Sequence, residues 1–193
     1  VNKFNSTTTT RLSASTITLG GSVTDRATVS GSGPTPTGTV TFEVSSDGGI
    51  DWTSFGGAKL LLMRSATSDA YTPPAPGNYL FRVVYGGDAT HNGSHSAKIA
   101  EPLRVNKANS TTTTLLSAAT ITLGGSVTDT ATVSGGLGPT PTGTVTFRVS
   151  TNGGLTWASF GGVKALIGGS ATSDPYTPAA VKSAWAMTFS RSL

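Results

Sequence analysis

Two histidines in one loop are the residues of this chain that come nearest to a catalytic arrangement. Ser94 precedes His95, and Asp88 and His91 lie just before them, so a Ser-His-Asp arrangement for nucleophilic catalysis could be drawn here. No Gly-x-Ser-x-Gly turn supports it, and two histidines lack the third ligand that a zinc site needs. We therefore expect a solvated loop, with no catalytic residue and no metal site.

Two segments, 45–52 and 150–157, resemble the Asp-box, Ser-x-Asp-x-Gly-x-Thr-Trp, which is familiar from sialidase propellers. That motif is a hairpin turn whose aspartate binds nearby backbone, whose glycine takes positive φ and whose tryptophan packs beside the turn. Glycoside hydrolysis would need paired carboxylates or a tyrosine nucleophile in a pocket, yet most of the nine acidic residues stand singly in turns. We interpret both segments as structural hairpins, although Asp51 and Asn152 depart from the motif. Their key residues are Asp47, Gly49 and Trp52 in the first copy and Asn152, Gly154 and Trp157 in the second.

Three Asn-x-Ser/Thr acceptors begin at Asn5, Asn92 and Asn109. Each lies in a predicted loop or domain end, where a glycan could be accommodated, so each is a possible glycosylation site. A calcium site needs six or more oxygen ligands, and Asp88 stands alone in its loop. We expect no calcium and no cofactor.

Composition excludes several classes of function. The net charge of +4 is spread over thirteen Lys and Arg without a basic run, which gives no electrostatic footprint for nucleic-acid binding. No segment approaches 18 consecutive apolar residues, so we expect no membrane span in this chain. The absence of cysteine rules out disulfides and thiolate metal sites, but it is compatible with an extracellular location.

Short strands must carry these loops. Segments 39–44 and 79–85 alternate polar and apolar residues with a period of two, which predicts half-buried strands. Their inward residues are Val40, Phe42, Val44, Tyr79, Phe81, Val83 and Tyr85. Further strands are expected near Ile17 and Leu19, along Val23, Ala27 and Val29 with Asp25 inward, near Leu60 and Leu62, and from Ser94 to Val105. About seven or eight short strands in about 100 residues indicate a two-sheet antiparallel sandwich.

The chain contains a long internal repeat. Residues 1–73 recur almost unchanged at 105–178, with Leu137 as an extra residue in the second copy. A period of about 100 residues suits an autonomous domain and is too long for a solenoid repeat of about 20–50 residues. We expect two domains, 1–104 and 105–193. Because Val1 has the same register as Val105, we expect a fragment of a longer array.

The copies diverge after Pro178, and the tail 179–193 replaces the end of the domain. In one interpretation the tail is a truncation or frame-shift product, and the second domain is merely less stable. In the other, a missing strand leaves an open edge that another chain fills by donor-strand complementation, with the N-terminal Thr segment as a candidate donor. Trp185, Met187 and Phe189 alternate and could imitate the strand at 79–83.

Several motifs in order resemble the prokaryotic immunoglobulin-like repeat domains of large bacterial and archaeal surface proteins. They are the Thr run, Gly-Gly-Ser-Val-Thr-Asp, Pro-Thr-Gly-Thr-Val-Thr-Phe and Gly-Asn-Tyr-Leu-Phe-Arg-Val-Val-Tyr-Gly-Gly-Asp. The resemblance covers nearly all of the first repeat and about 75 residues of the second. It implies an all-β chain of two tandem immunoglobulin-like antiparallel β-sandwiches, the second incomplete at its C-terminus. It also implies a role such as that of a spacer, an adhesin stalk or an envelope component.

The expected function is a structural spacer, stalk or envelope component of a repetitive extracellular surface protein, and not an enzyme. Its partners would be other copies of itself or neighbouring repeats, and surface glycans or proteins. One alternative is an adhesin or glycan-binding module that uses exposed loop aromatics, namely Trp52 and Trp157 with Phe55 and Phe160. A further alternative is a filament subunit that assembles by donor-strand complementation.

Overall fold

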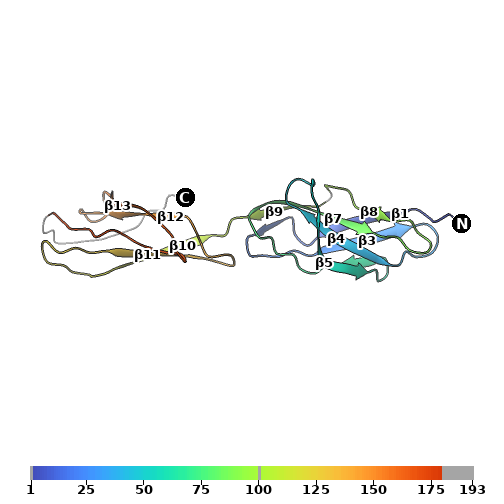
Figure 1. Cartoon of the computed structure of the whole chain (residues 1–193), viewed down its shortest axis with the longest axis horizontal. Coiled ribbons are helices and arrows are strands. Elements are labelled where there is room, and N and C mark those ends of the chain that lie inside the picture. The colour runs from blue at the N-terminus through green and yellow to red at the C-terminus, as the bar shows by residue number, and fades with distance from the viewer. Residues whose placement is uncertain (1, 100, 180–193) are drawn as a thin grey trace. The chain divides into compact units, whose positions relative to one another are not determined.

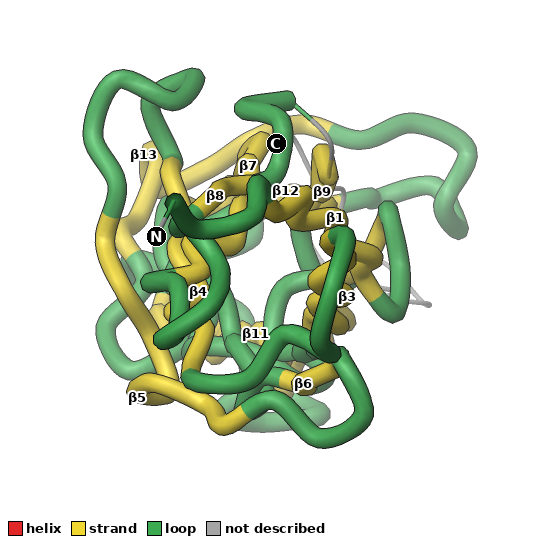
Figure 2. Tube along the Cα trace, turned by 90° about the vertical axis from the view of Figure 1, so that its right-hand side faces the viewer, coloured by secondary structure: helices red, strands yellow, loops and turns green. Residues whose placement is uncertain are grey.

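The computed structural model describes residues 2–99 and 101–179, and contacts divide the chain into two units, Val1–Ala108 and Asn109–Leu193 (Figure 1). Strands, turns and loops make up the described residues, with no helix among them (Figure 2). The predicted all-β fold is thus confirmed. The first unit extends past the repeat boundary because Val105 lies in its last strand and Ala108 packs against its core.

The first unit is a sandwich of two sheets. One sheet has the order β1-β3-β6 and the other the order β2-β9-β7-β4-β5, with β8 paired to β7. The first sheet consists of β1 (Ser6–Leu12), β3 (Asp25–Gly31) and β6 (Ser65–Thr67). The second consists of β2 (Thr16–Thr18), β9 (Glu101–Asn106), β7 (Gly77–Tyr85), β4 (Thr39–Ser45), β5 (Thr53–Leu60) and β8 (Ser94–His95). All pairs are antiparallel except β2 with β9, which run parallel.

The core of the first unit follows the alternation of β4 and β7. Val40, Phe42, Phe81 and Val83 are fully buried, as their period of two predicts. Around them lie two apolar clusters that take residues from both sheets, and Phe55 on β5 packs against both clusters. Burial of these side chains between the sheets is the main stabilising contribution.

Two of the expected strands differ in detail. Leu60 and Leu62 are exposed and Leu61 is buried instead, because three successive leucines offer no alternation from which the inward face can be chosen. The expected strand from Ser94 to Val105 is two strands, β8 and β9. Ser96 lies opposite Val83 through two hydrogen bonds, and the chain then loops out before β9 pairs with β7.

The second unit repeats the first part of this fold within residues 109–179. One sheet contains β10 (Ser110–Leu116), β11 (Asp129–Gly135) and β14 (Ser170–Thr172), and β12 (Thr144–Val149) pairs with β13 (Ala158–Ala165). Within 109–179 no strand corresponds to β7 or β9. Leu123 is 68% exposed, whereas Leu19 at the same repeat position is 9% exposed and packs in a cluster with residues of β7 and β9. The alternation predicted for Trp185, Met187 and Phe189 lies outside the described residues.

We predict that Phe42→Ala destabilises the first unit by about 3–5 kcal/mol, because it leaves a cavity between the sheets. This loss is comparable to the whole stability of a marginal domain. Hydrogen exchange of the β3, β4 and β7 amides measures it in the full chain. Leu62→Ala is the control, because Leu62 is 72% exposed and its truncation should change stability by no more than about 0.5 kcal/mol. Equal protection in both variants would contradict the prediction.

Candidate functional sites in the loops

The hairpin between β4 and β5 is held by one carboxylate. Asp47 Oδ1 accepts hydrogen bonds from Ser45 Oγ at 2.6 Å, the Ile50 amide at 3.0 Å and the Asp51 amide at 3.1 Å. The Ser45 hydroxyl and these amides hold the pKa of Asp47 below its ordinary value. Gly49 has a φ of 83°, a left-handed conformation that favours glycine. The carboxylate therefore acts as an acceptor for backbone amides, which is a structural role.

The second copy forms the same hairpin with an amide in place of the carboxylate. Asn152 Oδ1 accepts from Ser150 Oγ at 3.0 Å and from the Thr156 amide at 2.9 Å. Asn152 Nδ2 donates to Thr156 Oγ1 at 2.8 Å. The indole nitrogen of Trp157 donates to the Gly154 carbonyl at 3.1 Å. The turn needs an acceptor oxygen at this position, and both side chains supply one.

The tryptophans of the hairpins are less accessible than expected. Trp52 is half-buried and its indole nitrogen donates to the Gly49 carbonyl at 3.2 Å. The Arg82 guanidinium lies 4.3 Å from the centroid of the Trp52 ring, and Arg82 also pairs with Glu43 at 2.5 Å. One face of the ring is thus covered by a cation–π contact. The four aromatics expected to be exposed are half-buried instead, since Trp157, Phe55 and Phe160 have the same intermediate burial as Trp52.

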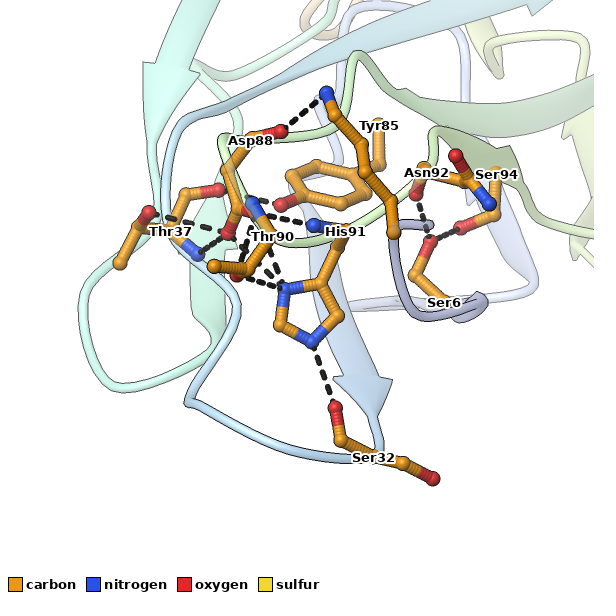
Figure 3. Close-up of polar contacts among 10 residues, drawn as sticks. Ser6, Ser32, Thr37, Tyr85, Asp88, Thr90, His91, Asn92 and Ser94 are labelled. Carbon is orange, nitrogen blue, oxygen red and sulfur yellow. Dashed lines mark hydrogen bonds and ion pairs between the residues drawn. The ribbon is translucent and has the colours of Figure 1, made fainter. Parts of the chain in front are cut away.

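A second carboxylate organises the loop after β7 (Figure 3). Asp88 accepts hydrogen bonds from the amides of Thr37 at 2.8 Å, Thr90 at 2.7 Å and His91 at 2.6 Å. These bonds, that of Thr37 first, hold the pKa of Asp88 far below its ordinary value. The Tyr85 hydroxyl donates to the Thr37 carbonyl at 2.7 Å, and burial raises the pKa of Tyr85 to about 12. Asp88 therefore ties two loops of the sandwich together.

His91 is 0% exposed, so the prediction of a solvated loop is wrong at this residue. Its Nε2 lies 3.0 Å from the Ser32 carbonyl, and its Nδ1 lies 2.9 Å from Thr90 Oγ1 and 3.1 Å from Asp88 Oδ1 (Figure 3). Because a carbonyl oxygen can only accept, Nε2 carries a proton. The imidazole is a buried bridge between two loops.

The Ser-His-Asp arrangement does not assemble. The Ser94 hydroxyl bonds to the hydroxyls of Ser6 at 2.7 Å and Thr8 at 2.8 Å. His95 is exposed, and its Nδ1 lies 3.0 Å from the Ser96 carbonyl. The aspartate of the loop, Asp88, contacts the other histidine. Ser94 therefore holds β8 against β1.

The same loop holds the segment that enters the domain. The Phe4 amide donates to the Thr90 carbonyl and the Asn92 amide donates to the Phe4 carbonyl, each at 2.8 Å. The Phe4 ring centroid lies 5.9 Å from that of His91. We call this arrangement of Phe4, Asp88, Thr90 and His91 the entry latch. Sequence reasoning missed it, although one signal was present: the second copy has Ala108 where the first has Phe4, and it has no histidine.

The three glycan acceptors Asn5, Asn92 and Asn109 are exposed. Asn92 Nδ2 donates to Asn5 Oδ1 at 3.2 Å, so two of them lie side by side on the entry latch. Their glycosylation stays a prediction.

One carboxyl group in each unit is buried on the inward face of a strand. Asp25 is 1% exposed; its Oδ1 accepts from the Arg11 amide at 3.2 Å and from the Thr10 hydroxyl, and its Oδ2 has no hydrogen-bond partner in the described structure. Burial raises the pKa of Asp25, and the nearby Glu101 raises it further. Burial also raises the pKa of Asp129 at the same position of the second unit. The hydrogen bonds of Asp25 come from groups of its own domain, and no hydrogen bond to either oxygen of Asp129 is found among the described residues. We therefore assign neither carboxyl group a role in proton transfer.

The described residues show two further features that bear on function. No group of three or more His, Asp or Glu side chains among them could hold a metal ion. No helix among them is long and apolar enough to cross a membrane.

Comparison with known proteins identifies a family for the first unit. Residues 8–102 match the bacterial immunoglobulin-like domain (group 3). This match spans the first unit from β1 into β9, and it confirms for the first repeat the resemblance found in the sequence. The search of curated proteins found no match to the chain.

We predict that Asp25→Asn raises the free energy of unfolding of the first unit relative to the wild-type chain, by an amount that increases with pH. The folded-state pKa of Asp25 in the wild-type chain lies above the ordinary 3.8. The contribution of this carboxyl group to stability is therefore fully present below about pH 3.8 and is lost as pH rises through the raised pKa. The gain in free energy of unfolding should therefore grow between about pH 3 and about pH 7. Denaturant titrations at several pH values measure it. Asp129→Asn should show the same trend in the second unit, and a trend of opposite sign would refute the assignment.

We predict that Asp88→Ala opens the entry latch without unfolding the sandwich. The amides of Thr37, Thr90 and His91 lose their acceptor, so their hydrogen exchange should accelerate while that of the β4 amides is unchanged. Nuclear magnetic resonance of the full chain measures both. Asp69→Ala is the control, because Asp69 pairs with Lys59 at the surface. Unchanged exchange at the three loop amides would show that Asp88 does not hold them.

Proposed function

Because residues 8–102 belong to the bacterial immunoglobulin-like domains of group 3, we propose that this chain is a spacer or stalk segment of a repetitive cell-surface protein. The observation that carries the proposal is that the polar side chains in the loops bind the backbone of their own domain. Asp47, Asp88 and His91 look chemically suggestive in the sequence, and each holds backbone groups of its own domain. Such a module supplies shape and length.

Both ends of the first unit are anchored in a way that suits this role. At the N-terminal end, Lys3 Nζ donates to the Asp88 carbonyl at 2.6 Å, and Phe4 is held by two backbone hydrogen bonds in the entry latch. At the C-terminal end, β9 lies between β2 and β7. Tension applied to either end is thus transmitted into paired strands. Residues 3–6 have the same register as the inter-repeat segment 107–110, so a latch of this kind would stiffen the entry to each complete repeat.

The other two expected functions have less support. An adhesin that binds through the covered face of Trp52 would have to displace the Arg82 side chain from that face. A filament built with the N-terminal Thr segment as donor would have to strip β1 from β3, which are paired from Ser6–Gly31 to Leu12–Asp25. Both cost native contacts, whereas the spacer role uses them. The extracellular location and the partners, namely neighbouring repeats, follow from the spacer role and are proposed with it.

We predict that arrays of the first repeat lengthen in proportion to the number of copies. Chains with two, four and six tandem copies of residues 1–104, each chain closed by residues 105–108, would be compared by small-angle X-ray scattering. A stiff array gives a maximum dimension that grows linearly, whereas a flexible string grows roughly as the square root of the number of copies. Phe4→Ala in every copy, which reproduces Ala108, should shorten the six-copy array. Square-root growth of the unaltered array would contradict the spacer proposal.

A further inference from the structure

The first unit contains a cavity beside the hairpin that follows β4. Its volume is about 230 Å³, and it lies between the β4–β5 hairpin and the aromatic residues at the edge of the core. The lining residues used below are Phe55, Tyr71, Tyr79, Asp51, Asp47 and Thr53. Trp52 does not line this cavity, and Arg82 covers one face of its ring.

One wall of the cavity is aromatic. The ring centroids of Phe55 and Tyr71 are 5.1 Å apart, and those of Tyr71 and Tyr79 are 6.3 Å apart with the rings edge to face. Tyr71 and Phe55 are half-buried, so part of each ring remains accessible from the cavity. Such a wall suits the C–H face of a flat, ring-shaped ligand.

At the rim of the cavity, one hydrogen-bond donor and one acceptor have no partner among the described residues, namely the Tyr71 hydroxyl and the Asp51 carboxylate. The Tyr79 hydroxyl donates to the Ala75 carbonyl at 2.8 Å, but no hydrogen bond within the described residues engages the Tyr71 hydroxyl. Asp47 is committed to the hairpin amides, whereas no hydrogen bond or ion pair of the described chain engages the Asp51 carboxylate. A ligand that both donates and accepts hydrogen bonds would satisfy this pair.

In the second repeat, the residue that corresponds to Asp51 is hydrogen-bonded within the hairpin. Thr156 replaces Asp51, and its hydroxyl accepts a hydrogen bond from Asn152 Nδ2 at 2.8 Å. In the first repeat the corresponding groups are two carboxylates, Asp47 and Asp51, which cannot bond to each other without a shared proton. Ala158 replaces Thr53 as well. The second hairpin is satisfied internally, whereas the exposed Asp51 carboxylate of the first is left to solvent or to a ligand.

We propose that this cavity of the first repeat binds one saccharide residue, either neutral or amino-substituted. The apolar face of a pyranose ring packs on Tyr71 and Phe55, and its hydroxyl or ammonium hydrogens bond to Asp51. The two carboxylates at the rim repel uronic and sialic acids. The volume fits about one sugar ring, so the affinity of a single site is low, with a dissociation constant of about 1 mM or weaker. Repetition of complete copies along an array would raise the avidity of a stalk for a glycan surface.

Saturation-transfer nuclear magnetic resonance on the full chain tests the proposal. The probes are glucose, galactose, glucosamine, N-acetylglucosamine and glucuronic acid. We expect transfer to at least one neutral or amino sugar and none to glucuronic acid. Asp51→Thr, which installs the residue of the second repeat, should weaken binding at least about tenfold, because it removes a hydrogen bond to a charged group. Tyr71→Phe keeps the ring and should weaken binding less.

Asp69→Thr is the matched control, because it removes the same charge from a surface ion pair with Lys59. Asp69 does not line the cavity, so binding should be unchanged. The proposal is overturned if none of the neutral or amino sugars receives saturation, or if glucuronic acid binds as well as the neutral or amino sugar that binds best. It is also overturned if Asp51→Thr binds like the wild-type chain, or if Asp69→Thr loses as much affinity as Asp51→Thr. Asp51→Thr should keep the turn, because the second repeat forms the same backbone hydrogen bond with threonine at this position.

Discussion

The pairing of β4 with β7 is the constraint on which the rest of the first unit depends. Its register places Phe42 opposite Val83 and Val44 opposite Phe81, so the two strands present one continuous apolar face to the other sheet. The loops take their positions from the same pair. The Asp47 hairpin begins where β4 ends, and the Asp88 loop begins where β7 ends. Because the strands are antiparallel, the hairpin with its cavity and the entry latch lie at opposite ends of the sandwich.

Carboxylates have a structural role in this domain because one carboxylate can accept several hydrogen bonds at once. A turn leaves several backbone amides without partners, and an unpaired amide is costly when it is shielded from water. One aspartate with two oxygens can accept several of these bonds, as Asp47 and Asp88 do. The same chemistry makes an aspartate beside a histidine look catalytic in a sequence. What separates the two roles is the partner, which here is the domain's own backbone.

Sequence reasoning predicted the parts of the fold that have a period and missed the parts that have none. The alternation of β4 and β7 identified their buried residues correctly. The Thr run carries no large apolar residue before Leu12, so it was not identified as a strand of the first sheet, although β1 pairs with β3 along its whole length. The burial of His91 depends on Phe4 and Ser32, which are distant in sequence. No local pattern reports such a contact.

The two repeats differ at positions that touch β7 and the loop after it. Phe4, which packs on His91, is Ala108 in the second copy. Glu43, which pairs with Arg82 of β7, is replaced by Arg148. If β7 of another copy were placed beside β12 in the register of the first unit, Arg82 would lie opposite Arg148, and like charges directly opposite each other destabilise a sheet. The second unit is therefore poorly matched to the β7 of its neighbour, which argues against assembly by strand exchange and in favour of separate modules in series.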